Sequence, residues 1–196
     1  MRVHRTWLSI VAAIALNLAA QAAPFVVFPK AGHLASQDGR FVVRNTDVEA
    51  QPLEFVGAFH SLFLEETATG RTRKLCDYVG VAAVAWTKNN LLIMTEYLSR
   101  RTSRALIFAA DSSRDTVVID QPSLANLAPV NLRPQLREND HVFVEAVQVE
   151  EETLTLRVWG YGKHDANGFR WRCEYSLRER SISCKDTPPT LSKTNN

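Results

Sequence analysis

The sequence lacks the motifs by which most enzymes are recognised. Its 196 residues contain no Gly-x-Ser-x-Gly nucleophile elbow, no His-Glu-x-x-His zinc motif, no phosphate-binding P-loop, no Gly-x-Gly-x-x-Gly and no Cys-x-x-Cys pair. Catalytic groups can also assemble from distant positions, so these absences lower the expectation of catalysis without removing it. We assign no catalytic residue, no metal site and no cofactor.

Long apolar runs are missing after the first 22 residues, so no later segment is expected to insert stably in a membrane. The first 22 residues combine Arg2 and Arg5 with an apolar run that ends in small residues at Ala20 and Ala22, which is typical of an export signal cleaved after Ala22. Cleavage would remove two of the 23 basic residues and none of the 21 acidic ones, leaving a formally neutral chain. We therefore predict an exported protein, periplasmic or secreted, with no electrostatic basis for binding nucleic acid.

Cysteine is scarce, with only three residues: Cys76, Cys173 and Cys184. From Phe169 to Leu177 apolar and polar residues alternate, which predicts a strand with Cys173 on its apolar face. A hairpin turn after this strand would bring Cys184 opposite Cys173, and in an oxidising compartment we favour a disulfide between them. A longer-range bond that uses Cys76 stays open as the alternative. The remaining thiol is expected to be a buried spectator, because no histidine lies in a motif that would activate it.

Helix patterns are also scarce, whereas strand patterns recur along the chain. The predicted strands lie near 25–28, 40–44, 59–65, 71–76, 81–86, 91–97, 104–109, 116–119, 141–149, 153–159, 169–177 and 182–184, with turn residues between them. The exception is 121–140, where three prolines and two leucines at helical spacing predict one or two short helical turns. We predict an all-β fold of antiparallel four-stranded meanders, stacked or sandwich-like, with a short helical connector near 122–139.

A weak internal repetition runs from Ser36 to Asp120. Ser36-Gln-Asp-Gly-Arg-Phe-Val-Val43 is followed by a strand that ends in Glu-Thr-Ala-Thr-Gly70, and a second round begins at Val84-Ala-Trp-Thr-Lys-Asn-Asn90. This pattern resembles the blades of TolB-like and WD40-like β-propellers. The resemblance implies blade-like meanders in an open stack, since the chain offers at most three units and a closed propeller needs four or more. It implies no functional residues.

These patterns together predict one β-rich domain. It would cover 23–185, with units at about 33–78, 79–120 and 141–185, and a disordered tail would follow at 186–196.

The segment with the most candidate binding residues is the glycine-framed hairpin between Trp159 and Trp171. Its tip could project a mixed aromatic and polar set, of the kind that recognises a protein or glycan surface: Tyr161, Lys163, His164 and Asp165. We expect the large aromatic residues of the hairpin, Trp159, Phe169 and Trp171, to pack inside.

Two functional hypotheses follow. The favoured one is an exported non-enzymatic binding protein whose partner is a protein or an envelope component, with inhibitor or immunity-type action as one concrete form. The alternative is a small secreted hydrolase whose site is built from His60, His164 and dispersed carboxylates. Self-association into a homo-oligomer that completes a ring is a further alternative.

Overall fold

The computed structural model describes residues 23–47, 59–112 and 114–186. The predicted signal segment with its cleavage site, and the predicted tail from 187 onward, lie outside the described residues. Within the described ranges, neither helix combines the length and apolar character that a membrane span requires.

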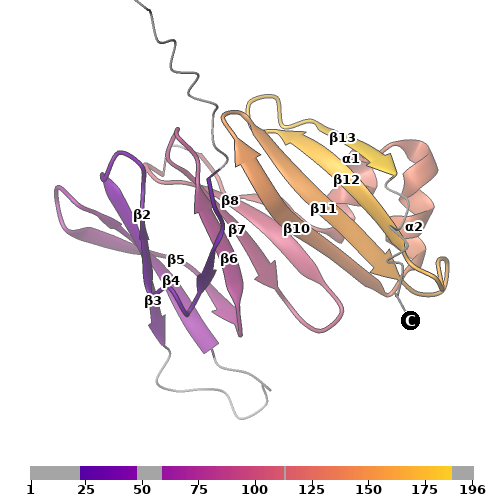
Figure 1. Ribbon diagram of the computed structural model, residues 1–196, viewed down its shortest axis with the longest axis horizontal. Helices are drawn as coiled ribbons and strands as arrows, with labels where there is room; N and C mark the ends of the chain where they lie inside the picture. Colours follow the sequence, from indigo (N-terminus) through magenta and orange to yellow (C-terminus); the bar gives the residue numbers. More distant parts are fainter. Residues whose placement is uncertain (1–22, 48–58, 113, 187–196) are drawn as a thin grey trace, which may run out of the picture.

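The described chain forms three antiparallel sheets, shown side by side in Figure 1. The N-terminal sheet has the order β2 (His33–Ala35), β3 (Phe41–Asp47), β4 (Phe59–Glu66), β5 (Arg71–Val79). The central sheet has the order β1 (Val26–Phe28), β6 (Ala82–Trp86), β7 (Leu91–Tyr97), β8 (Ser103–Ala109), β9 (Val117–Ile119). The C-terminal sheet has the order β10 (His141–Glu150), β11 (Thr153–Tyr161), β12 (Phe169–Ser176), β13 (Ile182–Asp186). The predicted fold class is confirmed.

Two features of the sheets were not predicted. Strand β2 has only three residues between two turns, which is too short for alternation to be visible in the sequence. Strand β1 was predicted, but its partner was not. It pairs with β6, more than fifty residues later in the sequence, and no local sequence pattern shows which distant strand a strand will pair with.

The central sheet is buried on both faces. On β7, Ile93 and Met94 are both fully buried, although consecutive strand residues point to opposite sides. Met94 belongs to a core shared with the N-terminal sheet, and Ile93 belongs to a second core shared with the C-terminal sheet and the helices. The described part of the chain therefore has two hydrophobic layers, with the central sheet between them.

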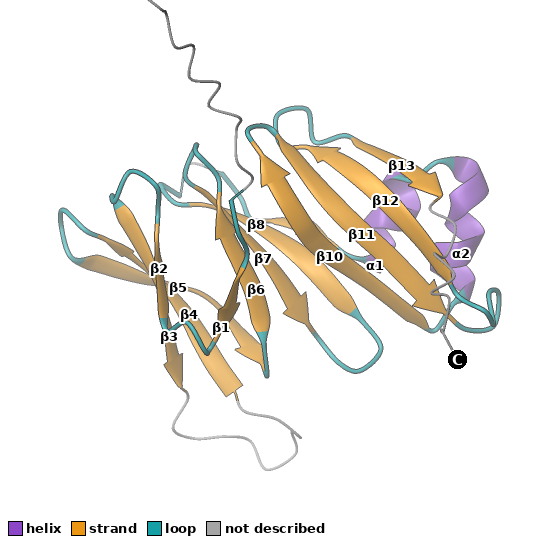
Figure 2. Ribbon diagram, in the orientation of Figure 1, coloured by secondary structure: helices purple, strands orange, loops and turns teal. Residues whose placement is uncertain are grey.

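The predicted helical connector is confirmed as α1 (Gln121–Leu127), a 3₁₀ turn (Val130–Leu132) and α2 (Arg133–Glu138). Helix α1 begins with a capping box, in which the Asp120 side chain accepts from the Ser123 backbone N–H and the Ser123 hydroxyl accepts from the Asp120 N–H. Leu124 and Leu136 are fully buried in the same core as the apolar residues of the C-terminal sheet. The two helices thus cover one face of that sheet (Figure 2).

Hydroxyl groups of the central sheet hold the edge strand β10 in place. The Ser103 hydroxyl accepts from the Val144 N–H at 2.9 Å and donates to the Val144 carbonyl at 3.0 Å. The Thr95 hydroxyl accepts from the Ala146 N–H at 2.9 Å. These bonds satisfy backbone groups at an edge and fix the orientation of the C-terminal sheet.

The predicted disulfide is confirmed, since Cys173 and Cys184 are bonded and lie directly opposite each other on β12 and β13. Cys76 remains a free thiol on β5, and its Sγ donates to Met94 Sδ at 3.6 Å. Burial, reinforced by the Glu96 carboxylate, raises the pKa of Cys76 to about 12. The thiol is therefore protonated at neutral pH, as expected for a spectator rather than a nucleophile.

Candidate binding face of the C-terminal sheet

The C-terminal sheet has one buried face and one face that is exposed mainly along β12. Along β12 the side chains alternate strictly, with Trp171 and Cys173 buried and Arg170 and Arg172 exposed. The buried side meets the helices and the central sheet. The opposite side is called the outer face below, and its aromatic and charged residues are His141, Phe143, Glu145, Glu150, Arg157, Trp159, Tyr161, Arg170, Arg172, Glu174 and Lys185.

Stacked aromatic rings form one part of the outer face. Phe143 on β10 and Trp159 on β11 are directly paired, and their ring centroids lie 4.1 Å apart at 15°. In the next row His141 and Tyr161 stack at 4.3 Å and 11°. Tyr161 is 42% exposed, so an apolar surface with a polar tip is open to solvent at the end of this row.

Basic groups form the other part of the outer face. Arg170 lies opposite Trp159, and Arg172 lies between Arg157 and Lys185 in the neighbouring row. Arg157 donates to the buried Glu145 carboxylate at 2.6 Å, and this pair is mutually neutralised. Among the described residues, Arg170, Arg172 and Lys185 have no ion-pair partner, and all three are exposed. The outer face therefore carries a cluster of positive charge beside its aromatic rows, while its exposed acids Glu150 and Glu174 lie toward the opposite end of the strands.

Tyr97 of the central sheet completes the arrangement around Glu145. Its hydroxyl donates to Glu145 Oε1 at 3.1 Å. Burial and the adjacent carboxylate raise the pKa of Tyr97, so the hydroxyl keeps its proton and remains a donor. Glu145 thus has two donors, which accounts for a carboxylate that is only 6% exposed.

The predicted tip residues divide into two groups. Asp165 anchors the tip, because its carboxylate accepts from Asn139 at 2.9 Å and from Gln135 at 3.4 Å, both on or beside helix α2. The Asn139 side-chain oxygen in turn accepts from the backbone N–H groups of His164 and Asp165. Tyr161, Lys163 and His164 are exposed and remain available for binding.

The electrostatics of the tip follow from these bonds. Burial opposes ionisation of Asp165, but the hydrogen bonds from Asn139, His164 and Gln135 outweigh it and lower the pKa of the carboxyl group. His164 Nδ1 lies 2.8 Å from Asp165 Oδ2. The carboxylate is therefore ionised at neutral pH and ties the tip to helix α2.

A pocket of about 450 Å³ lies between the tip and the outer face, with Trp159, Tyr161, Asn167 and Arg170 in its wall. Gly160 also lines this pocket, and a Cβ atom there would be 2.2 Å from the His141 carbonyl oxygen. Only glycine fits at this position, so the close approach of β10 and β11 that stacks the aromatic rows depends on it.

The expectation that Trp159 packs inside with Phe169 and Trp171 is wrong. Phe169 and Trp171 are buried, whereas Trp159 is only half-buried and lies on the outer face. The alternation along β11 predicts this orientation. Leu154, Leu156 and Val158 lie on its buried side, so the next residue, Trp159, points to the opposite side.

The residues of the hydrolase hypothesis are not brought together. His60 is buried on β4, where its ring packs against Tyr78 with centroids 5.1 Å apart, whereas His164 lies at the tip of the C-terminal sheet. His164 does contact a carboxylate, but it does not line the pocket beside it. In the described ranges no group of three or more His, Cys, Asp and Glu side chains is arranged to hold a metal ion.

Comparison with known protein families gives no match for this chain. Comparison with curated proteins gives no significant match either. What the protein does is therefore inferred from its own residues.

Proposed function

We propose that this chain is an exported, non-enzymatic binding protein that recognises another protein through the outer face of its C-terminal sheet. The observation that carries the proposal is the cross-strand row Phe143, Trp159 and Arg170, flanked by Arg172 and Lys185 without ion-pair partners. Tryptophan, tyrosine and arginine are the residues that contribute most energy at protein interfaces. Inhibition of the bound partner is one form that such binding takes.

The positive charge of the outer face indicates which kind of protein it binds. Three exposed cations without carboxylate partners favour a protein that presents an acidic surface, because charge complementarity speeds encounter and fixes orientation. Trp159, stacked on the buried Phe143, and the exposed Tyr161 supply the apolar centre, and the tip with Lys163 and His164 lies at one end of it. Rigid strands and an anchored tip reduce the entropy lost on binding.

Export is supported by two independent features. The disulfide between Cys173 and Cys184 is consistent with an oxidising compartment. The first 22 residues have the composition of a cleaved export signal. We therefore expect the partner to be found outside the cytoplasm.

The test compares variants of the full mature chain as bait in an extracytoplasmic extract. The double variant Arg170→Glu/Arg172→Glu reverses the charge of the outer face, and Trp159→Ala removes the aromatic centre. Lys30→Glu is the matched control, since Lys30 is an exposed cation between β1 and β2. We expect one acidic protein to be retained by the wild type and by Lys30→Glu and lost by the other two.

The affinity of the purified wild type and variants for the retained protein then tests the proposal. Each outer-face variant should weaken binding about 30-fold or more, the effect of losing a central interface side chain. Unchanged affinity for both variants would disprove the proposal. Binding of the wild type to anionic vesicles in place of a protein would also disprove it and would point to an envelope lipid.

A further inference from the structure

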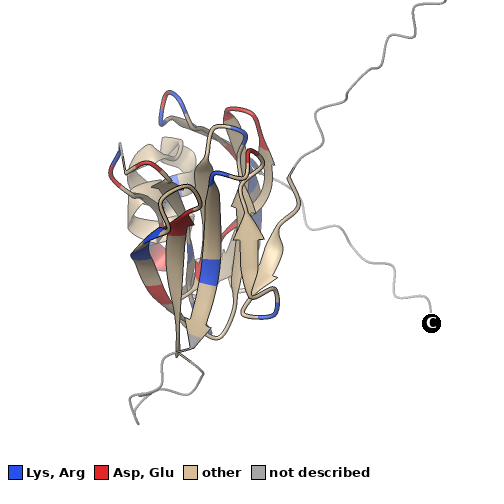
Figure 3. Cartoon of the chain, turned by 90° about the vertical axis from the view of Figure 1, so that its left-hand side faces the viewer, with Lys and Arg blue, Asp and Glu red and all other residues tan. Residues whose placement is uncertain are grey.

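A second cavity lies at the opposite end of the strands from the tip. Its volume is about 650 Å³, within the range of small-molecule sites. Turns from all three sheets meet around it: those between β2 and β3, β6 and β7, β8 and β9, β10 and β11, and β12 and β13. Figure 3 shows the charged residues concentrated in the turns at this end. We call this cavity the turn-end cleft.

The cleft has an apolar floor and a charged wall. Phe41, Leu91, Ala109 and Leu177 supply apolar surface from different sheets. The wall carries the cations Arg40, Lys88, Arg114 and Arg178 and the anions Asp111, Glu151 and Glu152. This composition differs from the outer face, where aromatic rows dominate.

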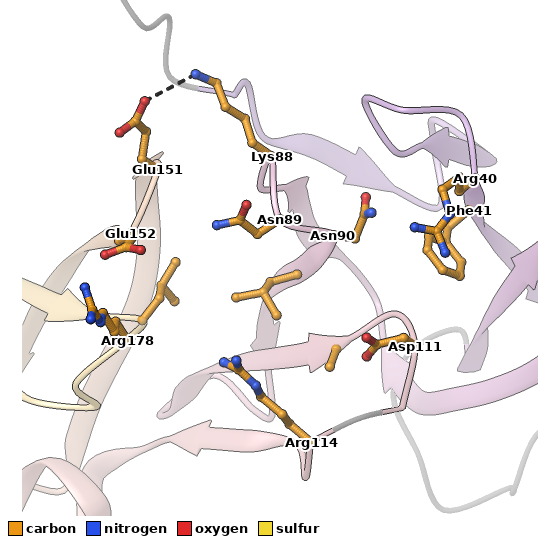
Figure 4. Close-up of a pocket in the computed structure, with 13 residues that line it drawn as sticks. Arg40, Phe41, Lys88, Asn89, Asn90, Asp111, Arg114, Glu151, Glu152 and Arg178 are labelled. Carbon is orange, nitrogen blue, oxygen red and sulfur yellow. Dashed lines mark hydrogen bonds and ion pairs between the residues drawn. The ribbon is translucent and has the colours of Figure 1, made fainter.

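Three guanidinium groups in the cleft are available to a ligand. Arg114 and Arg178 have no hydrogen-bond or ion-pair partner within the described ranges, and both are exposed. The guanidinium of Arg40 lies over the Phe41 ring, 5.3 Å from its centroid, and leaves its N–H groups unused among the described residues. In Figure 4, Arg178 and Arg40 lie on opposite sides of the cleft and Arg114 lies between them.

The rim of the cleft is braced by bonds between turns of different sheets. Asn90 donates to Asp38 at 2.7 Å, which joins the turn of the central sheet to that of the N-terminal sheet. Lys88 contacts Glu151 at 3.4 Å, which joins the central turn to the C-terminal sheet. The hydrogen bond from Asn90 is the main reason that the pKa of Asp38 falls to about 2, so this brace persists at all but the lowest pH.

We propose that the turn-end cleft binds an anionic sugar, a saccharide of about two rings that carries carboxylate or phosphate groups. Guanidinium groups form paired hydrogen bonds with the oxygens of either anion. The exposed Glu152 carboxylate accepts from sugar hydroxyl groups, and it disfavours a pure polyanion such as nucleic acid. Leu91, which is only half-buried, provides an apolar surface for the sugar carbons.

The proposal is independent of the protein-binding face, because the cleft shares no residue with that face and lies at the other end of the same sheet. The cleft was not apparent in the sequence, since each turn contributes only one to three residues to it.

Three probes test the proposal: digalacturonate for the carboxylate, lactose 1-phosphate for the phosphate and lactose as the neutral disaccharide. Binding to the mature chain is followed by calorimetry and by backbone amide shifts in the NMR spectrum. We expect one anionic sugar to bind and to shift amides at Lys88–Asn90, Arg114 and Arg178, while lactose does not. The sugar that binds identifies the anion.

Variants separate the cleft from general surface charge. Arg114→Ala/Arg178→Ala should weaken binding of the anionic sugar at least about tenfold, since two charge-assisted hydrogen-bonding groups are lost. Arg100→Ala/Arg101→Ala removes two exposed arginines from the loop between β7 and β8, at the other end of the strands, and should leave binding unchanged. Failure of both anionic sugars to bind, equal binding of lactose, or equal effects of the two double variants would overturn the proposal.

Discussion

The central and C-terminal sheets are built from similar antiparallel strands but differ in what covers them. Strand β7 of the central sheet has five consecutive buried residues, whereas β12 of the C-terminal sheet alternates buried and exposed residues along its whole length. Among the described residues, the central sheet packs into a hydrophobic core on both faces, whereas the C-terminal sheet does so on one. A sheet with a free face can carry a binding surface at little cost in stability, whereas the central sheet is a scaffold.

The strongest test of this difference compares neighbours on β12. Trp171 is 1% exposed and Arg172 is exposed, so Trp171→Ala should destabilise the chain by about 3–5 kcal/mol and Arg172→Ala by no more than about 0.5 kcal/mol. Urea denaturation measures both. Trp171→Phe retains an aromatic ring and should lose less than Trp171→Ala, because the indole N–H that it gives up makes no hydrogen bond within the described ranges. Similar losses for Trp171→Ala and Arg172→Ala would mean that the outer face is covered.

The companion test uses neighbours on β7. Ile93 and Met94 are both 0% exposed but belong to the two different cores. Replacing either by alanine should therefore cost about 2–5 kcal/mol, in contrast to the unequal pair on β12. The same denaturation experiment applies. A small effect at only one of the two positions would show that one face of the central sheet is loosely packed.

Much of this contrast was accessible from the sequence. The alternation from Phe169 to Leu177 predicted the strand, its buried face and the disulfide partner of Cys173, because side-chain parity along a strand is a local property. The helical connector was predicted from prolines and helical spacing, and the capping residues Asp120 and Ser123 agree with it.

The binding surfaces were harder to predict, because they depend on contacts between distant residues. Phe143 and Trp159 are sixteen positions apart, and only the register of β10 against β11 brings their rings together. Asp165 was proposed as a binding residue but serves as an anchor, since its partners Gln135 and Asn139 come from a helix that precedes the whole sheet. The turn-end cleft combines residues from five turns, and no local pattern marks such a site.

The smallest expected effect is a response to acid. It distinguishes the loop between β7 and β8 of the central sheet from the tip between β11 and β12 of the C-terminal sheet. The loop of the central sheet is closed by bonds between Ser99 and Thr102, which involve backbone and hydroxyl groups that do not titrate. The tip of the C-terminal sheet is held by the Asp165 carboxylate, whose pKa is lowered by its donors. A lowered carboxyl pKa stabilises the fold above the ordinary aspartate pKa, and this contribution is lost as pH falls through the lowered value.

Acid should therefore loosen the tip and leave the loop of the central sheet unchanged. The amide resonances of His164 and Asp165, whose N–H groups bond to Asn139, report on the tip between neutral pH and about pH 2, and those of Leu98 and Ser99 report on the loop. Asp165→Asn should abolish the acid transition. His164→Gln should retain it, because the Asp165 carboxylate is still present and still accepts from Asn139 and Gln135. If both loops shifted together, or if His164→Gln alone abolished the transition, the carboxylate would not be the anchor.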